Sequence, residues 1–376
     1  MTATQNLINA IRKNNIDDVL TALKNGANVN AEDGYQSILD IAIQNDNPKI
    51  VSLLLKKGKT KIYQSSLHKA LFMTFQNEKR EMARLVVSHI EDTSIGAAYN
   101  PTFLNAAIQL NWPEVLDKLL EKDFKLKEKE RFGKKLYHEA VYNNSHDCVK
   151  ILLKHKADMH DFYGSTNALH IAAQFGRTKI LETLIDAGGD INKTPLCFTD
   201  GLKILAMLST GFLYIPDPTP QNKVIHVAAQ DGEVEIIDLL MKKCKEDVKI
   251  DEPGDENKPP LIQAIEQGHY QAARRLLEYG ADPNVQDDIG TSLHAAVRNN
   301  DYELIQLLFE YGADQRLTGK CKKTPLQYAK YLQENNCISR DDCINELEKA
   351  WKIGSSIAKQ KPYYRKGFGK NNERGS

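Results

Sequence analysis

The 376-residue sequence lacks the features typical of a secreted, membrane-spanning or disulfide-stabilised protein. It has no apolar run long enough to cross a bilayer, and its first residues lack the basic and apolar regions of a secretory signal. The six cysteines are scattered without a paired framework, as free thiols are in a reducing compartment. We therefore expect a cytoplasmic protein with no transmembrane segment and no cleaved leader.

Motifs for catalysis, metal binding and nucleotide binding are also missing. Gly58-Lys59-Thr60 imitates the end of a phosphate-binding loop, but Leu53 stands where that loop needs glycine. His138-Glu139 has no second histidine at the spacing of a zinc-protease helix, and Cys197 has no base at a spacing that suits nucleophilic catalysis. The sequence predicts no catalytic residue, no metal site, no cofactor and no small-molecule substrate. We interpret the protein as not an enzyme.

Neither sign of charge prevails overall, because 50 Lys and Arg residues balance 50 Asp and Glu residues. The distribution is uneven: residues 352–376 carry seven positive residues against Glu373, a balance of +6 that leaves −6 on residues 1–351. The basic and aromatic segment 360–370 has the composition of tails that bind nucleic acid or an anionic membrane. A plain disordered end is the alternative that we favour.

What the sequence does contain is a short pattern that recurs at intervals near 32 residues. The clearest copies are Asn167-Ala-Leu-His-Ile-Ala-Ala173, Lys223-Val-Ile-His-Val-Ala-Ala229, Thr291-Ser-Leu-His-Ala-Ala-Val297 and Thr324-Pro-Leu-Gln-Tyr-Ala-Lys330. Weaker copies begin at Gln5, Ser37, Ser65, Thr102, Lys135 and Pro259. Ten copies of one unit predict an extended solenoid that has a long exposed face and no enclosed pocket.

Each copy has the pattern of two short helices joined by a turn. A polar N-cap residue opens several units, namely Ser37, Ser65, Thr102, Thr291 and Thr324. Pro260 and Pro325 stand at the first helical position, where a missing N–H costs nothing. Small residues such as Ala172 and Ala173 let two helices approach closely, and a second apolar-periodic helix follows the turn. A glycine-type stop, as in Gly280–Asn284, ends the unit.

Departures from the period are expected to map to loops. The third copy starts only 28 residues after the second, and its second helix is expected to begin late, after Asn77-Glu-Lys-Arg80. The acidic stretch 246–257 is expected to be a solvated connection, with a docking patch for a basic partner as the alternative. A degenerate copy at Thr194 runs into the proline-rich stretch 212–220, which cannot be helical and is predicted to form an extended loop.

Taken together, these copies resemble ankyrin repeats. The opening Thr-Pro-Leu-His of that family is matched in pieces across the copies, and residues 280–297 match its pattern almost continuously. The resemblance covers about residues 4–352 and implies an all-α ankyrin-repeat solenoid of stacked helix–turn–helix units with projecting β-hairpin-like loops. Five histidines stand at the family's histidine position: His68, His138, His170, His226 and His294. There the family implies hydrogen bonds to loop backbone that tie neighbouring repeats together.

We divide the chain into four parts. Residues 1–192 are expected to hold repeats 1–6, and residues 193–221 a degenerate repeat or extended loop. Residues 222–352 are expected to hold repeats 7–10 and a C-terminal cap, and residues 353–376 a basic, disordered tail.

The resemblance implies a non-catalytic scaffold that binds a partner protein on its concave face and loop tips. Aromatic side chains beside the turns or in the irregular unit are the predicted contacts, because aromatics dominate interface hot spots. They are Tyr35, Phe132, Phe162, Tyr163, Phe212 and Tyr214, with Tyr63 in a similar place. Two alternatives stay open: a secreted bacterial effector that binds a host protein through its ankyrin array, and an enzyme or toxin with a site hidden in residues 193–221.

Overall fold

The computed structural model describes residues 2–57, 61–91, 100–122, 133–160, 166–194, 222–320, 322–336 and 339–360. These residues are helical apart from a two-stranded hairpin, isolated bridge residues and the connections. The chain divides into two compact units, the first Met1–Ala172 with Lys179–Asp190 and the second Ala173–Thr178 with Ile191–Ser376. Each unit is a stack of paired helices, so the predicted all-α fold of helix–turn–helix units is confirmed.

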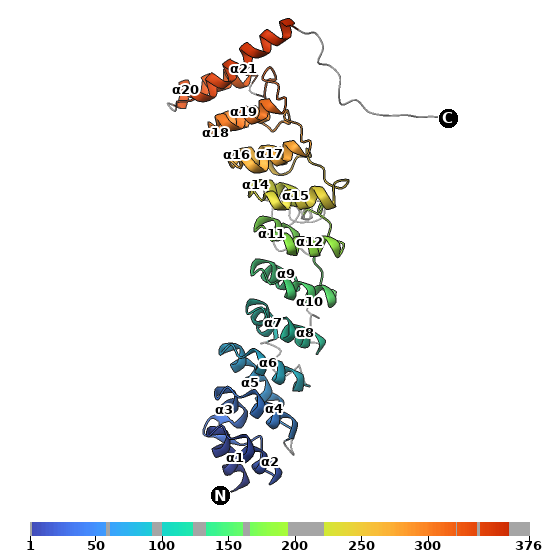
Figure 1. The fold of residues 1–376 in the computed structure, drawn as a ribbon, viewed down its shortest axis with the longest axis vertical. Helices are drawn as coiled ribbons and strands as arrows, with labels where there is room; N and C mark the ends of the chain where they lie inside the picture. The colour runs from blue at the N-terminus through green and yellow to red at the C-terminus, as the bar shows by residue number, and fades with distance from the viewer. Residues whose placement is uncertain are drawn as a thin grey trace, which may run out of the picture. The chain divides into compact units, whose positions relative to one another are not determined.

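The first unit contains five complete helix pairs. They are α1 (Ala3–Arg12) with α2 (Ile16–Lys24), α3 (Ile38–Gln44) with α4 (Pro48–Lys57), α5 (Gln64–Gln76) with α6 (Arg80–His89), α7 (Asn100–Gln109) with α8 (Pro113–Glu121), and α9 (Gly133–Tyr142) with α10 (His146–Lys154). Within this unit the first helices of the pairs stack on one side and the second helices on the other (Figure 1). A further pair, α11 (Ala168–Gln174) and α12 (Thr178–Asp186), lies where the two units divide.

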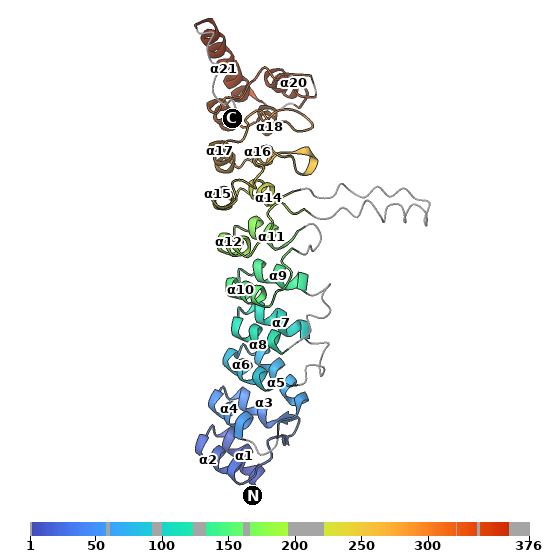
Figure 2. The ribbon, with the colours of Figure 1, turned by 90° about the vertical axis from the view of Figure 1, so that its right-hand side faces the viewer.

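The second unit continues the same arrangement with four pairs among its described residues. They are α14 (Val224–Gln230) with α15 (Val234–Lys243), α16 (Pro260–Glu266) with α17 (Tyr270–Glu278), α18 (Ser292–Asn299) with α19 (Tyr302–Glu310), and α20 (Pro325–Asn336) with α21 (Asp341–Gln360) (Figure 2). A short 3₁₀ turn, η2 (Asp255–Asn257), precedes α16. The described helix pairs therefore number ten, one for each predicted copy. The degenerate copy falls almost wholly outside the described residues.

Several helix starts follow directly from the local sequence. Ser37 caps α3 in a reciprocal box, since its Oγ accepts from the N–H of Asp40 (3.1 Å) while the Asp40 carboxylate accepts from the N–H of Ser37 (3.1 Å). Thr291 precedes α18, and α16 and α20 begin at the predicted prolines. The prediction was wrong for Ser65 and Thr102, which lie inside α5 and α7.

The extra turn of α5 explains the irregular spacing of the third copy. This helix has 13 residues, against seven in α3. The second helices α4, α6 and α8 begin at Pro48, Arg80 and Pro113, which are 32 and 33 residues apart. The predicted late start of the second helix is confirmed: α6 begins at Arg80, 15 residues after Ser65, against 11 residues from Ser37 to Pro48, because α5 is longer than α3. Phe75 near the end of α5 stacks on Phe103 (ring centroids 5.7 Å apart) and on Trp112 (5.3 Å).

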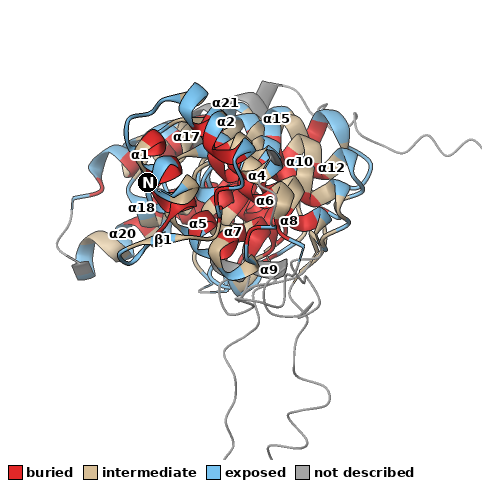
Figure 3. Ribbon diagram, turned by 90° about the horizontal axis from the view of Figure 1, so that it is seen from below, coloured by how far each residue is buried: buried red, intermediate tan, exposed pale blue. Residues whose placement is uncertain are grey.

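The core lies between the stacked helices. Leucines at the predicted core position, such as Leu39, Leu169 and Leu293, are buried, and so are the paired alanines Ala172 and Ala173. Figure 3 shows the buried residues on the inward faces of the helices and the exposed residues on the outward faces.

Candidate protein interface

Histidines at the predicted position join successive repeats through main-chain carbonyl groups. The Nε2–H groups of His138, His226 and His294 donate to the carbonyl oxygens of Thr166 (3.1 Å), Glu252 (2.8 Å) and Lys323 (3.0 Å), each 26–29 residues further along the chain. The predicted ties are therefore confirmed at these three positions. The loops that would play the same part for His68 and His170 lie outside the described residues.

The second ring nitrogen of these histidines is also used. Nδ1 of His226 accepts from the N–H of Lys223 (3.2 Å), and Nδ1 of His294 accepts from the N–H of Thr291 (3.1 Å). An accepting Nδ1 leaves the proton on Nε2, as the bonds to the carbonyl groups require. Burial lowers the pKa of His294, which keeps its ring neutral. Both nitrogens hold the fold together, and the ring is not available as a metal ligand.

The first candidate contact stands at the tip of a β-hairpin between α2 and α3. Strands β1 (Glu32–Asp33) and β2 (Gln36–Ser37) pair antiparallel, with Gly34 and Tyr35 forming the turn. Gly34 takes a φ of +68°, a conformation that glycine adopts without steric cost. The side chain of Tyr35 points into solvent, with 97% of its surface exposed.

The backbone beneath Tyr35 is held by the following repeat. Nζ of Lys69, in α5, donates to the carbonyl oxygen of Tyr35 (3.2 Å) and pairs with the carboxylate of Asp40 (3.2 Å). The Asp40 side chain is 1% exposed and also caps α3. A buried carboxylate with two partners is costly to displace. The tip is therefore rigid at its backbone while the aromatic ring above it is exposed.

Tyr63 corresponds to Tyr35 in the sequence of the next repeat, 28 residues later and followed by the same Gln-Ser pair, and it stands at the N-cap of α5. Its side chain is 63% exposed. The N–H of Tyr63 donates to Oδ1 of Asn30 (2.9 Å), and Nδ2 of Asn30 donates to the carbonyl oxygen of Lys61 (2.9 Å). In the second unit, Ile289 is exposed on a loop whose residues Gln286 and Thr291 form an antiparallel bridge. Exposed aromatic or apolar side chains thus stand on the connections before α3, α5 and α18.

Of the predicted contact residues, Tyr35 is exposed at a hairpin tip and Tyr63 is exposed at the N-cap of α5. The other five lie outside the described residues: Phe132, Phe162, Tyr163, Phe212 and Tyr214. Their role in binding stays a prediction.

Sequence reasoning missed a second group of exposed aromatic residues on the first helices. They are Phe72, Tyr142, Phe175 and Tyr331, on or directly after α5, α9, α11 and α20. Tyr142 and Phe175 stand two and one residues before the left-handed turn residues Asn144 and Gly176. An alignment of the copies on that turn residue, rather than on the loop glycine, would have identified these exposed aromatic residues.

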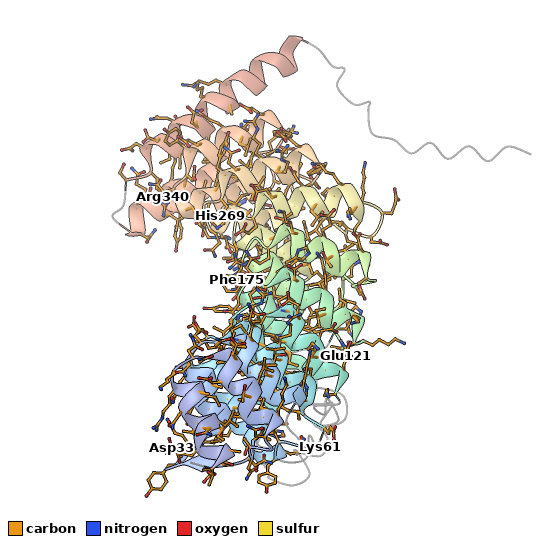
Figure 4. The ribbon with its side chains drawn as sticks, turned by 60° about the horizontal axis from the view of Figure 1, so that its bottom comes forward. Asp33, Lys61, Glu121, Phe175, His269 and Arg340 are labelled. Carbon is orange, nitrogen blue, oxygen red and sulfur yellow. The ribbon has the colours of Figure 1, made fainter. Side chains whose placement is uncertain are left out.

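Neighbouring turns pack closely in the second unit, where Phe175 and His269 mark one edge (Figure 4). A Cβ on Gly176 would lie 2.4 Å from Oε2 of Glu233, and one on Gly232 would lie 2.7 Å from the ring of His269. Burial, followed by repulsion from Glu235, raises the pKa of Glu233. The side chain of one turn therefore fills the space left by glycine in the preceding turn.

The acidic connection before α16 is tied to its surroundings. Glu252 pairs with Nζ of Lys223 (2.6 Å), a hydrogen bond that lowers the pKa of Glu252, and the carboxylate of Asp251 accepts from the N–H of Asp282 (3.0 Å). Glu256 pairs with Lys258. Since these carboxylates already have partners within the chain, the connection acts as a link between repeats.

Two classes of site receive no support from the part of the chain that the structure describes. In these ranges, no cluster of three or more His, Cys, Asp or Glu side chains is placed to hold a metal ion. None of the helices searched there has both the length and the apolar character needed to span a membrane. The exposed surfaces described above are therefore the candidate functional features.

Comparison with known proteins points to one kind of repeat. Residues 103–195 match a family model described as ankyrin repeats in three copies, and residues 261–309 match one described as ankyrin repeats in many copies. The chain is similar to the human transient receptor potential cation channel subfamily A member 1, at 25% identity over 314 residues that cover 77% of this chain and 25% of that protein.

A second relative is the ankyrin repeat and SOCS box protein 3 of Bos taurus, at 32% identity over 159 residues, covering 36% of this chain and 30% of that protein. Among solved structures, the ankyrin repeat domain of Bcl-3 aligns with a TM-score of 0.49 and 22% identity, over 65% of this chain and 97% of that one. The chain spans between a quarter and a third of the length of the two curated relatives.

Proposed function

We propose that this chain, which contains ankyrin repeats, is a non-catalytic scaffold that binds a partner protein. The contacts are made by its hairpin tips and by the exposed aromatic residues at the first helices. Two features support a binding role: exposed aromatic side chains precede the first helices of two successive repeats, and the backbone beneath them is fixed by contacts between repeats. We place this activity in the cytoplasm, in keeping with the buried free thiols of Cys148 and Cys343.

The observation that carries the proposal is Tyr35. A tyrosine that is 97% exposed gains nothing for folding from its ring, yet it stands on a turn that Lys69 and Asp40 hold in place. A ring of this size buries about 150–250 Å² in a contact, and a fixed backbone loses little entropy on binding. An exposed aromatic on a rigid support is therefore suited to anchor a partner.

The alternative functions gain no support from these observations. Neither relative named above is a bacterial effector. A hidden enzyme site would fall in residues 193–221, almost all of which lie outside the described residues. We therefore carry forward only the binding function.

Affinity capture with the full chain tests the proposal. Wild-type protein and a Tyr35→Ala/Tyr63→Ala variant are immobilised, and proteins retained from a eukaryotic lysate are quantified by mass spectrometry. Tyr302→Ala is the matched control, because Tyr302 is exposed at the start of the second helix α19, away from the tips. The melting temperature of each variant is measured first, and none is expected to fall by more than about 1–2 °C, since exposed truncations cost little.

We expect wild type and the control to retain the same stoichiometric partner, and the tip variant to lose most of it. Loss of two anchors of hot-spot size, about 2 kcal/mol each, corresponds to a drop in affinity on the order of a thousandfold. Retention of no stoichiometric partner by any of the proteins would refute the binding function. Equal retention by the tip variant would refute the role of the tips.

A further inference from the structure

A row of polar side chains runs along the first helices of the first unit. Its members are the last residues of α1, α3, α5, α7 and α9: Arg12, Gln44, Gln76, Gln109 and Tyr142. Successive members are 32 or 33 residues apart, and each stands two residues before a left-handed turn residue, namely Asn14, Asp46, Glu78, Asn111 and Asn144. We call these five residues the first-helix row.

Members of the first-helix row are neighbours in space. α1 packs on α3, α3 on α5, α5 on α7 and α7 on α9, and Figure 2 shows these helices stacked in that order. Packed helices lie about 8–10 Å apart, so the row repeats at that interval. All five side chains are exposed. The row is thus a regular ladder on the surface of the first unit.

The three glutamines of the row have hydrogen-bonding capacity that the fold does not use. No side-chain amide of Gln44, Gln76 or Gln109 makes a hydrogen bond to any of the described residues. The next residue along is different: Nδ2 of Asn45 donates to the carbonyl oxygen of Ile11 (2.6 Å), which links α3 to α1. Each exposed carboxamide therefore offers two donors and one acceptor to a ligand.

The spacing between members of the first-helix row can be compared with the repeat distance of each possible backbone conformation of a ligand. A polyproline II segment has three residues per turn and a rise of about 3.1 Å, so equivalent carbonyl groups recur about every 9.3 Å. A β-strand presents equivalent groups about every 6.7 Å, which does not match 8–10 Å. An α-helix has already satisfied its carbonyl groups. Only the polyproline II backbone offers unpaired carbonyl oxygens at the spacing of the amides.

Aromatic and charged residues in and beside the first-helix row are consistent with a polyproline II ligand. Phe72 is exposed one helical turn before Gln76, and Tyr142 closes the row with 60% of its side chain exposed. Proline-rich segments bind surfaces lined by aromatic rings. At the other end of the row, Arg12 pairs with the carboxylate of Asp33, and Lys13 beside it is an exposed cation at the end of α1. An acidic residue on the ligand would meet Lys13.

We propose that the first-helix row binds a proline-rich segment in the polyproline II conformation, with an acidic residue at the end that meets α1. This inference rests on the proposed binding function and names the class of partner. Gln44, Gln76 and Gln109 donate to ligand carbonyl groups on successive turns, while Phe72 and Tyr142 pack against proline rings.

A titration followed by NMR tests the inference on the full chain. The probe is a synthetic peptide of nine prolines with a glutamate at each end, added to ¹⁵N-labelled protein while the glutamine side-chain NH₂ signals are observed. The comparison peptides carry lysine in place of glutamate, or nine alternating glycine and serine residues. The test variant is Gln44→Ala/Gln76→Ala/Gln109→Ala, and the control variant replaces three exposed glutamines outside the row, Gln5→Ala/Gln267→Ala/Gln271→Ala.

We expect the proline peptide to shift the three NH₂ signals of the row in wild type and in the control variant. The row variant should bind on the order of tenfold to a hundredfold more weakly, because three net hydrogen bonds are lost. The lysine peptide should bind about two- to fivefold more weakly, as expected for exposed charges. The glycine–serine peptide should bind more weakly still, because it is not preformed.

Two results would overturn the inference: NH₂ signals that do not move with the proline peptide, or equal affinity of the row and control variants. If either occurs while the capture experiment still yields a tip-dependent partner, the proposed function stands and only the partner class is wrong. If no partner is captured and the peptide does not bind, both are wrong.

Discussion

The substitution Leu293→Ala tests whether the copies were aligned correctly and whether a core mutation destabilises the neighbouring repeats. The side chain of Leu293 is 1% exposed in α18, which packs against α16, α19 and α20. Leu293→Ala removes buried methyl and methylene groups and leaves a cavity, at a cost of about 2–5 kcal/mol. In a stack of repeats each unit contacts only its neighbours, so the loss is expected to stay local.

Hydrogen–deuterium exchange of the full chain measures this effect. In the variant, amide protection should fall in α16, α18, α19 and α20, while α1 to α6 keep the protection of wild type. Ile289→Ala is the control, since Ile289 is an exposed residue on the loop before α18 and should change stability by less than about 0.5 kcal/mol. No loss of protection around α18, or an equal loss for both variants, would refute the placement of Leu293 in the core.

Three further predictions concern single side chains. The pKa of Glu233 is raised in the folded protein, so its protonated form stabilises the fold at acid pH and this contribution is lost as the pH rises through the folded pKa. In urea unfolding, Glu233→Gln should therefore be more stable than wild type at pH 7 and should lose that advantage below about pH 4. His294→Ala removes the bond to Lys323 and leaves the buried N–H of Thr291 without its acceptor, and should cost about 1–3 kcal/mol by the same measurement. Burial raises the pKa of Cys148 to about 12, so its thiol should resist alkylation at pH 8 in the folded protein and react at once in denaturant; rapid labelling without denaturant would contradict its burial.

Much of the fold could be predicted from the sequence because each repeat carries its own local signals. The capping box of Ser37 with Asp40 and the prolines at the starts of α16 and α20 depend only on neighbouring residues. The error at Ser65, which lies inside α5, has a non-local cause. An extra helical turn in α5 is supported by the stacking of Phe75 on two rings of the next repeat, a contact that no local pattern reveals.

The candidate interface was predictable only in part. Tyr35 stands beside a glycine turn, and that signal led directly to an exposed ring. The exposed end of each first helix was missed because its turn is made by Asp46, Glu78 or Asn111, residues that take positive φ without being glycine. Which side of a helix faces solvent depends on how it packs against the next repeat, and a single copy of the pattern does not contain that information.

The most direct test of the binding function is hydrogen–deuterium exchange of the full chain with and without its captured partner. We expect new protection at the hairpin tip around Tyr35, at the start of α5 around Tyr63 and at the ends of the first helices of the first unit, with no change in the second helices α2, α4, α6 and α8. Protection confined to those second helices, or none at the tips, would contradict a partner-binding surface built from tips and first helices.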